Sequence, residues 1–482
     1  MHRQLRTALA TAAAAALTGG LLVVTASTAT AVTPSGTRGD FNGDGYRDIA
    51  VTAPLATVNG KSGAGSVSIL YGSKSGAGAA KIQTVSQDSA GVPGTAEKND
   101  MFGGTVSAGD FNGDGYADLA VGANGEDVGS DVNGGSVTIL WGASGGLSGG
   151  TNIKDPSAGS HDLFGLLVAA GDYNGDGRAD LAIGSDQNTV DIYRGGFTKT
   201  GGTGGHYAVT APVQKVPGPD FYNLTPGDVN HDGRTDLVVD GYETDSQEGW
   251  NANFYLPGSA SGLTSTGAQK LPAGIISDIG DVNGDGYGDI VIGAHWDKDV
   301  PGSHKGGVVK VVYGTQAGPD GGQDSVNQDS PGVPGTGETA DDFGYELSLG
   351  DVNGDGKDDL VVGAPGEDLN GIADAGMVTV LYGSTGGFAS TGAQSFAQDS
   401  PGVPGDNEKG DGFGEEVYLA DTNNDGKADL TVGIPHENNG DGYLVTFNSD
   451  GTKLAATGKG YGLTATKVSA AGTPLLGFGM AG

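Results

Sequence analysis

The sequence predicts an all-β fold, a seven-bladed β-propeller of four-stranded blades whose ring is closed by the C-terminal strand. Three observations lead to this prediction. A nine-residue pattern, Asp-x-Asn-x-Asp-Gly-x-x-Asp, occurs seven times, and its copies begin 53 to 70 residues apart. A short apolar strand follows each copy, and Gly makes up 94 of the 482 residues, which suits tight turns and disfavours helices. The chain therefore reads as an array of repeats, each of them one supersecondary unit.

The first 31 residues have the pattern of a secretory signal peptide. Arg3 and Arg6 give a charged start, residues 8–24 are apolar and rich in Ala, and Ala29-Thr30-Ala31 is an A-x-A cleavage site. A membrane anchor is the alternative, but the apolar stretch is short and interrupted by Gly. The sequence thus predicts a secreted chain whose propeller spans residues 32–482.

Strands are expected directly after each nine-residue loop and again after the next Gly-rich turn. The first kind is represented by residues 49–51, 119–121 and 360–362, and the second alternates apolar and polar residues, as in 66–72. A Gln-Asp-Ser-x-Gly-Val-Pro-Gly segment recurs at 87–94, 328–335 and 398–405 and is expected to join one unit to the next. Each unit then has room for the four strands of a propeller blade.

The first unit is incomplete, because too little chain precedes Asp40 to supply the Phe-Gly strand found before other loops. Four later loops carry that dipeptide, starting at Phe102, Phe164, Phe343 and Phe413. A similar dipeptide, Phe478-Gly479, stands near the C-terminus. We expect this strand to complete the first blade, which would remove two exposed sheet edges.

Each nine-residue loop has the ligand pattern of a Ca²⁺ site. Oxygen-bearing side chains occupy the first, third, fifth and ninth positions around a Gly, and the seventh position is expected to offer its backbone carbonyl. A metal-free Asx-turn is the alternative, but all seven copies keep the three Asp, the Asn and the Gly. We therefore expect about seven Ca²⁺ ions. The candidate ligands are Asp40, Asn42, Asp44, Tyr46, Asp48; Asp110, Asn112, Asp114, Tyr116, Asp118; Asp172, Asn174, Asp176, Arg178, Asp180; Asp228, Asn230, Asp232, Arg234, Asp236; Asp281, Asn283, Asp285, Tyr287, Asp289; Asp351, Asn353, Asp355, Lys357, Asp359; and Asp421, Asn423, Asp425, Lys427, Asp429.

Composition narrows the range of partners. The formal net charge is −35, which argues against nucleic acid and anionic membranes as partners. The chain has no Cys, so disulfides cannot stabilise it, and bound metal is the natural substitute. No segment beyond the signal is apolar enough to span a bilayer, and we expect a monomer.

These motifs resemble the FG-GAP repeats of the integrin α-subunit β-propeller. The sixth unit matches in full, with Phe343-Gly344, the loop at 351–359 and Gly363-Ala364-Pro365, whereas the third and fourth units lack the Gly-Ala-Pro. The chain looks most like secreted bacterial members of the family. The resemblance implies a seven-bladed propeller, cations in the loops of one face, and partner contacts on the opposite face.

Several other motifs have ordinary explanations. Arg38-Gly39-Asp40 spells an integrin-recognition tripeptide, but Asp40 is also the first metal ligand. Two G-x-S-x-G matches, at 142–146 and 146–150, have no helix after them and so lack the context of a catalytic serine. The Glu-Asp pairs at 126–127 and 367–368 are expected to form hydrogen bonds within turns.

Two tryptophans are the candidates for contact with a partner. Trp250 lies in a polar stretch, and Trp296 lies in the loop after the fifth Gly-Ala strand. Each ring could pack between blades, or it could be exposed and stack on a sugar or anchor a protein.

The function expected from the sequence is non-catalytic, adhesion-like binding of an extracellular protein or glycan. The alternative is an exported hydrolase acting on a glycan or lipid, because some proteins that carry these repeats are hydrolases. No combination of base, nucleophile and orienting residue is visible, which favours binding over catalysis.

Overall fold

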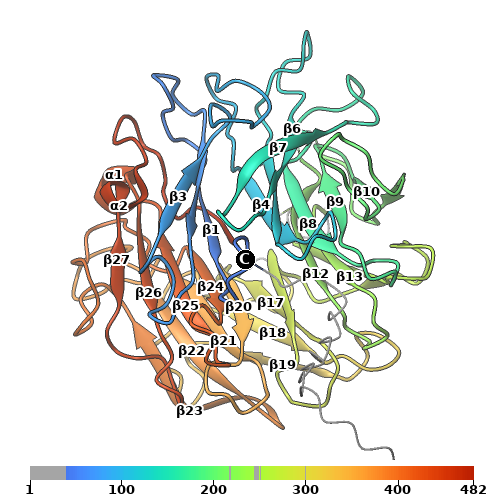
Figure 1. Cartoon of the computed structure of the whole chain (residues 1–482). Helices are drawn as coiled ribbons and strands as arrows, with labels where there is room; N and C mark the ends of the chain where they lie inside the picture. Colours follow the sequence, from blue (N-terminus) through green and yellow to red (C-terminus); the bar gives the residue numbers. More distant parts are fainter. Residues whose placement is uncertain (1–38, 217–218, 244–248, 250, 299) are drawn as a thin grey trace, which may run out of the picture. The chain divides into compact units, whose positions relative to one another are not determined.

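The computed structural model describes residues 39–216, 219–243, 249, 251–298 and 300–482. The predicted signal peptide and Arg38 lie outside this part. The described residues form seven antiparallel sheets of four strands each, arranged around a common centre (Figure 1). The predicted all-β, seven-bladed propeller is therefore confirmed.

Within each blade the strands follow one another outward from the centre. Blade 1 holds β28 (Met480–Ala481), β1 (Ile49–Ala53), β2 (Ser66–Leu70) and β3 (Ile82–Val85). Blade 2 holds β4 (Thr105–Gly109), β5 (Asp118–Ala123), β6 (Ser136–Trp141) and β7 (Ser148–Ile153). Blade 3 holds β8 (Leu167–Gly171), β9 (Asp180–Gly184), β10 (Thr189–Tyr193) and β11 (His206–Thr210). Blade 4 holds β12 (Phe221–Gly227), β13 (Asp236–Gly241), β14 (Ala252–Leu256) and β15 (Gln269–Lys270). Blade 5 holds β16 (Ile276–Gly280), β17 (Asp289–Ala294), β18 (Val308–Val312) and β19 (Gln323–Val326). Blade 6 holds β20 (Leu347–Gly350), β21 (Asp359–Ala364), β22 (Met377–Ser384) and β23 (Gly387–Phe396). Blade 7 holds β24 (Glu416–Ala420), β25 (Asp429–Ile434), β26 (Tyr443–Phe447) and β27 (Lys459–Tyr461).

The hydrophobic core lies between neighbouring blades. Val67 of blade 1 and Val121 of blade 2 belong to one buried cluster, together with Phe102 of the connecting segment. The strand after each acidic loop is buried along its whole length, as in β5 and β21. This continuous burial follows from packing on both faces, and it explains why these strands are apolar runs rather than alternating ones.

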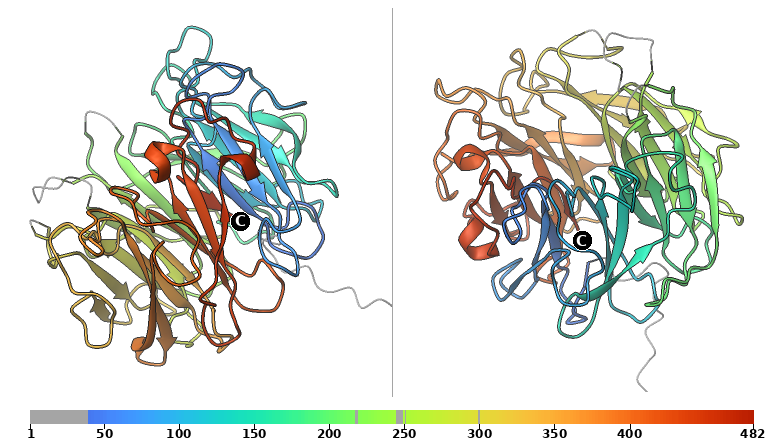
Figure 2. Two further views of the ribbon diagram at one scale, coloured as in Figure 1. Left: turned by 90° about the vertical axis from the view of Figure 1, so that its left-hand side faces the viewer. Right: turned by 90° about the horizontal axis from the view of Figure 1, so that it is seen from above.

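Helix is confined to single turns. In the described part of the chain these are α1 (Glu437–Gly440), which contains two left-handed Asn residues, and α2 (Leu463–Thr466) (Figure 2). Neither these turns nor any other helix of the described residues is long and apolar enough to cross a membrane.

The C-terminal strand closes the ring, as predicted. β28 pairs with β1 through Val51–Met480 and Ala50–Ala481, and the hydroxyl of Tyr418 in blade 7 donates a 2.7 Å hydrogen bond to the carbonyl of Gly482. The chain end consequently lies at the centre of the inner strands (Figure 1). Blade 1 is built from both ends of the described chain.

The prediction that Phe478-Gly479 replaces the missing dipeptide is wrong by two residues. In blade 2 the Gly103 amide donates to the second strand, and in blade 1 the equivalent donor is Gly477, 3.0 Å from the Thr52 carbonyl. Leu476 is fully buried, whereas Phe478 is 46% exposed. The sequence Leu-Gly-Phe-Gly offers two dipeptides, and the pair with the side chain that fills the interface takes the position.

Candidate functional site

All seven acidic loops lie at one end of the ring. In blades 2 to 7 each loop joins the innermost strand to the second strand, and in blade 1 the loop leads directly into β1. Because neighbouring strands are antiparallel, the loops between the second and third strands lie at the opposite end. The predicted metal loops and the predicted partner face therefore lie at opposite ends of the propeller.

The first Asp of each loop is held by backbone amides. In the sixth loop, Asp351 Oδ1 accepts hydrogen bonds from the amides of Gly354 and Asp355, and Oδ2 accepts one from Gly356. The bond from the sixth-position Gly recurs in all seven loops at 2.7 to 2.9 Å. That Gly has a φ of 80° to 90° in every copy, a conformation that a residue with a Cβ avoids.

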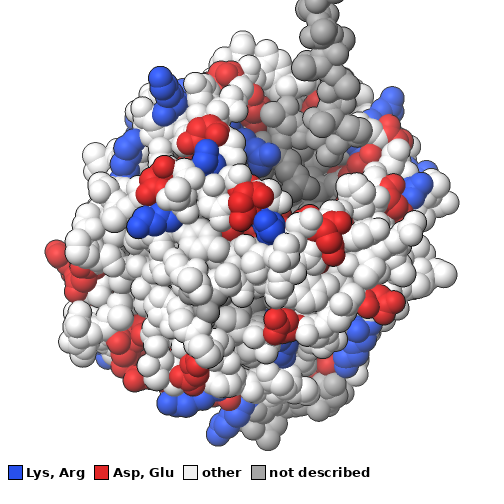
Figure 3. Space-filling view, turned by 90° about the horizontal axis from the view of Figure 1, so that it is seen from below, with Lys and Arg blue, Asp and Glu red and all other residues white. Residues whose placement is uncertain are grey.

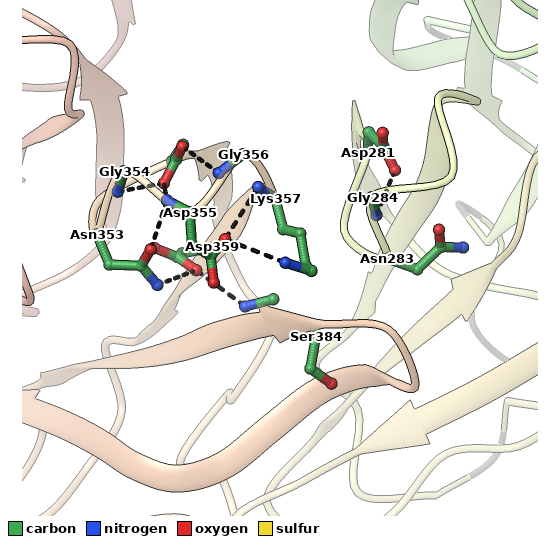
Figure 4. A network of polar contacts seen from close by, with 12 residues as sticks. Asp281, Asn283, Gly284, Asn353, Gly354, Asp355, Gly356, Lys357, Asp359 and Ser384 are labelled. Carbon is green, nitrogen blue, oxygen red and sulfur yellow. Dashed lines mark hydrogen bonds and ion pairs between the residues drawn. The ribbon is translucent and has the colours of Figure 1, made fainter.

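The third and fifth positions turn the loop further. Asp355 Oδ1 accepts from the amide of Lys357 at 3.0 Å, and this contact recurs in every loop. Asn353 accepts from the Asp355 amide and lies 3.5 Å from Asp359, so these two side chains face each other (Figure 4). The third, fifth and ninth positions are thus brought to one side of the loop.

The ninth Asp has a structural role that the pattern alone did not reveal. Asp359 is fully buried and accepts one hydrogen bond from Val352 in its own loop and one from Gly383 of β22. In every blade the ninth Asp accepts such a bond from an amide in the third strand or in the two residues that follow it. The ninth carboxylate therefore fastens the loop to the blade, whether or not a metal is bound.

Burial and like charge raise the pKa of each ninth-position carboxyl. Desolvation is the largest cause in every loop, and the first and fifth Asp of the same loop add repulsion in most of them. The pKa values are about 8 for Asp48, about 7 for Asp118, Asp180, Asp289 and Asp359, and about 6 for Asp236 and Asp429. A cation in the loop would relieve this repulsion.

The donor set fits a hard cation. Each loop offers three carboxylates and one amide oxygen, the ligand chemistry of Ca²⁺, and two of the carboxylates repel a third that is buried. In the part of the chain that the structure describes, no three acidic or His side chains are already grouped as metal ligands, and the carboxylates of each loop accept hydrogen bonds from loop amides. The seven loops are those that would hold the ion, and it would supply charge neutralisation.

The seventh-position side chains connect neighbouring loops. Tyr116 lies against Gly43 of the preceding loop, and Lys357 lies against Gly284 in the same way. The Nζ of Lys357 is also 3.5 Å from Asp355 of its own loop (Figure 4). The side chain at this position therefore makes contacts of its own, although the pattern predicted a role only for the backbone carbonyl.

A Gln–Glu hydrogen bond joins blades at the opposite end. Gln398 of the recurring Gln-Asp-Ser segment donates to Glu437 at 2.7 Å, and both residues are buried. Gln87–Glu126 and Gln328–Glu367 make the same contact, each across 39 residues. This identical spacing was a signal in the sequence that the prediction missed. The neighbouring Asp127 and Asp368 accept bonds within their own turns, as predicted.

The two tryptophans and the two G-x-S-x-G serines, the other candidates from the sequence, do not form one site in the described residues. Trp296 is half-buried and its ring lies 4.7 Å from that of His295, while Trp250 lies outside the described residues. Ser144 and Ser148 of the two G-x-S-x-G matches lie in a turn and at the start of β7, with no helix after them. Acidic and basic side chains are interspersed over the face in Figure 3, so the negative charge forms no single patch there.

Known proteins match the chain over its repeats. The family described as FG-GAP repeat matches residues 32–70, 102–140, 273–312, 343–381 and 413–447, and the FG-GAP-like repeat matches 172–239. Integrin alpha-PS2 of Drosophila melanogaster is 28% identical over 277 residues, which are 57% of this chain and 16% of that protein. Phosphatidylinositol-glycan-specific phospholipase D of Bos taurus is 34% identical over 152 residues, which are 31% of this chain and 18% of the enzyme.

The chain thus spans less than a fifth of the length of these relatives. What it shares with them is a limited region, and the repeat matches together take in more than half of the chain. They fall on the acidic loops and the strands around them. With seven four-stranded blades and one such loop in each, the chain belongs to the FG-GAP repeat family.

Proposed function

We propose that this protein is a secreted, Ca²⁺-stabilised β-propeller that works as a non-catalytic binding module at or outside the cell surface. The loop geometry is the observation that carries the proposal. Seven loops repeat the same arrangement of three carboxylates, and in each of them burial raises the pKa of the ninth Asp. A fold that keeps so much like charge together is one that a cation would stabilise.

Calcium binding is tested on the purified chain without its first 31 residues. The protein is stripped with EGTA, and its melting temperature is measured as Ca²⁺ is added. Extracellular Ca²⁺ modules bind at roughly 10⁻⁴–10⁻³ M, so the melting temperature should rise over that range. A melting temperature that does not respond to millimolar Ca²⁺ would contradict the proposal.

A matched pair of variants locates the effect in a loop. Asp355→Asn removes one charge from the sixth loop and keeps a side chain that can accept the Lys357 amide, so it should reduce the gain from Ca²⁺. Asp320→Asn removes an exposed charge from a turn outside the loops and should leave the gain unchanged. Equal responses of the two variants would place the Ca²⁺ elsewhere.

The binding role rests on the likeness to integrin α chains and on the two-faced architecture. With the metal loops at one end, the opposite end is free to carry partner loops, including the one that holds Trp296. A glycan array and a panel of extracellular proteins, each probed with labelled protein in Ca²⁺, would test this role. A hydrolase screen beside them tests the enzyme alternative, which no arrangement of side chains in the described residues favours.

A further inference from the structure

Neighbouring acidic loops are hydrogen-bonded to one another through the residue at their eighth position. In the sixth loop this residue is Asp358, whose amide donates a 2.9 Å hydrogen bond to the carbonyl of Asp281, the first residue of the fifth loop. The Asp281 amide donates in return to Asp358 Oδ2, also at 2.9 Å. Two bonds therefore join the first residue of one loop to the eighth residue of the next. We call this pair of bonds the loop clamp.

The same loop clamp joins the third and fourth loops through a different side chain. The Thr235 amide donates to the Asp172 carbonyl at 2.8 Å, and the Asp172 amide donates to Thr235 Oγ1 at 3.0 Å. Thr is uncharged, whereas Asp is an acid, but each offers an oxygen acceptor. The clamp therefore depends on an acceptor at the eighth position and not on a charge.

The remaining eighth positions make fewer of these bonds. Ala117 and Ala428 keep only the backbone bond to the first residue of the preceding loop, because Ala has no side-chain acceptor. Among the described residues, Arg47, Ala179 and Gly288 make neither bond to the preceding loop. Neighbouring loops are thus joined at this position by two bonds, by one or by none.

The fourth and fifth loops are the clearest unclamped pair. A space of about 340 Å³ lies between them, and both loops contribute to its lining, with Asp228 and His231 on one side and Asp281 and Tyr287 on the other. The fifth loop therefore has a clamped neighbour in the sixth loop and an unclamped neighbour in the fourth. This difference provides a comparison within one molecule.

The clamp acts on the part of the sixth loop that carries candidate ligands. Asp358 lies between Lys357, whose carbonyl is a candidate ligand, and Asp359, the buried ninth-position carboxylate. The side chain of Lys357 also lies against Gly284 of the fifth loop (Figure 4). Asp281 and Asp358 are both half-buried, and a hydrogen bond partly withdrawn from water is strengthened. The fifth loop thus positions residues 357–359 of the sixth.

We propose that the loop clamp couples Ca²⁺ binding in neighbouring loops, so that the fifth and sixth loops, and likewise the third and fourth, bind the ion cooperatively. This inference rests on the proposed Ca²⁺ sites and adds that they are not independent. Asp358 and Thr235 act as positioning residues, because neither stands at a ligand position of the pattern.

The physical basis of the coupling is shared ordering. When the fifth loop is fixed by its ion, Asp281 is fixed with it, and the two bonds of the clamp then hold Asp358 and the residues on either side of it. Part of the entropy cost of ordering the sixth loop is already met, so its ion binds more tightly. By linkage the sixth loop favours binding in the fifth by the same factor. Direct repulsion between neighbouring ions has the opposite sign and cannot imitate this effect.

Hydrogen exchange read by mass spectrometry follows each loop separately as Ca²⁺ is added to the full propeller. The Ca²⁺ concentration at which a loop peptide is half protected is the midpoint of that loop. Asp355→Asn weakens binding in the sixth loop and should raise the fifth-loop midpoint about fivefold or more. Asp232→Asn weakens binding in the fourth loop, and it should raise the third-loop midpoint but leave the fifth-loop midpoint unchanged.

Variants of the clamp itself assign the coupling to the bond. In an Asp358→Ala background, Asp355→Asn should shift the fifth-loop midpoint much less, because the side-chain acceptor is gone. In an Asp358→Asn background the full shift should remain, because Asn keeps an acceptor and loses only the charge. Thr235→Ala makes the same test on the third and fourth loops, which covers the case in which Asp358→Ala does not fold.

The outcomes separate this inference from the proposed function. If no loop gains protection from Ca²⁺, the proposed Ca²⁺ sites are wrong and the coupling is overturned with them. If the loops respond but the fifth-loop midpoint does not rise in Asp355→Asn, or rises equally in Asp232→Asn, the sites stand and the coupling is overturned. A loss of coupling in Asp358→Asn as large as in Asp358→Ala would also overturn it, by showing that charge and not the bond is responsible.

Discussion

At the scale of single residues, the loops are governed by backbone conformation as much as by charge. The fourth position is left-handed in every loop: Gly occupies it in five copies, with a φ of 71° to 77°, while His231 and Asn424 stand there in the other two at 54° and 56°. The repeated pattern indicated the candidate ligand positions, because the Asp, Asn and Gly at the first, third, fifth, sixth and ninth positions never vary. It did not reveal the fourth-position conformation, although the Gly in five copies was a usable signal.

The first prediction concerns this strain. A left-handed conformation costs a residue with a Cβ roughly 1–2 kcal/mol, part of which Gly gives back through the entropy of the unfolded chain. His231→Gly should therefore raise the free energy of unfolding by about 0.5–1 kcal/mol. Urea unfolding in saturating Ca²⁺ measures it.

Asn424→Gly is the comparison for this prediction. Asn tolerates the left-handed region better than His, so this second change should gain less. A gain at Asn424 that equals or exceeds the gain at His231 would show that backbone strain is not the cause.

The second prediction concerns the pH dependence of stability. Glu346 has an ordinary pKa of 4.5, which burial and the charges of Asp278 and Asp240 raise in the folded protein, and Glu416 of the next blade interacts with it by like charge. The folded state then holds a proton that the unfolded state releases, so this group loses stability as the pH rises above about 4.5 toward its folded pKa. Glu346→Gln should stabilise the protein more at pH 8 than at pH 5.

Thermal melting at the two pH values, with Glu338→Gln beside it, tests this pH effect. The control residue is exposed and should show no such difference. A stabilisation by Glu346→Gln that is the same at both pH values would mean that Glu346 carries no extra proton in the folded state.

At the scale of elements, blades are joined by contacts that recur at fixed spacings. The ninth Asp fastens each loop to the third strand or to the turn directly after it, and the Gln–Glu bonds fasten three pairs of neighbouring blades. The strands themselves could be predicted from apolar runs and Gly-rich turns. The contacts between blades could not, because they depend on which segments the ring brings together.

The third prediction concerns the Gln–Glu bond. Gln398→Ala removes the donor to buried Glu437 and leaves its carboxylate without that bond. Losing one partner of a buried polar pair costs about 1–3 kcal/mol. Gln316→Ala, at an exposed position, should change stability by less than about 0.5 kcal/mol.

Chemical unfolding of the two Gln variants compares them directly. If Gln398→Ala proves no more costly than Gln316→Ala, the bond does not hold the blades together.

At the scale of the whole molecule, the fold could be predicted more fully than the central cavity. The sevenfold repeat indicated the number of blades, and the missing first strand indicated ring closure. Phe478 was given the wrong place because a local motif was followed, whereas burial at the interface decides the register. The central cavity and its carboxylates could not be foreseen, since Asp278, Glu346 and Glu416 come from three blades and meet only at the centre.

The fourth prediction concerns closure. Deleting residues 475–482 removes β28 and the buried Leu476, and it leaves the edge of β1 unpaired. The shortened protein should melt at a lower temperature and aggregate more readily, even in saturating Ca²⁺, because open strand edges pair between chains. Melting and light scattering measure these effects, and a deletion that is silent in both would show that the strand is dispensable.

The pairing of β1 with β28 also constrains how the protein reaches its folded state. Ala50 and Ala481 are nearly the whole described chain apart, so their contact closes a very long loop, and contacts between distant residues form slowly. Six blades are made of local sequence and can form in any order, but blade 1 has to wait for the last segment of the chain. We predict a late, slow phase in refolding that is absent from the variant lacking residues 475–482. The change in tyrosine fluorescence around Tyr418, recorded by stopped flow, measures this phase. Until that step is complete, the first acidic loop belongs to an unfinished blade, so the ring acquires its full set of loops only at the end.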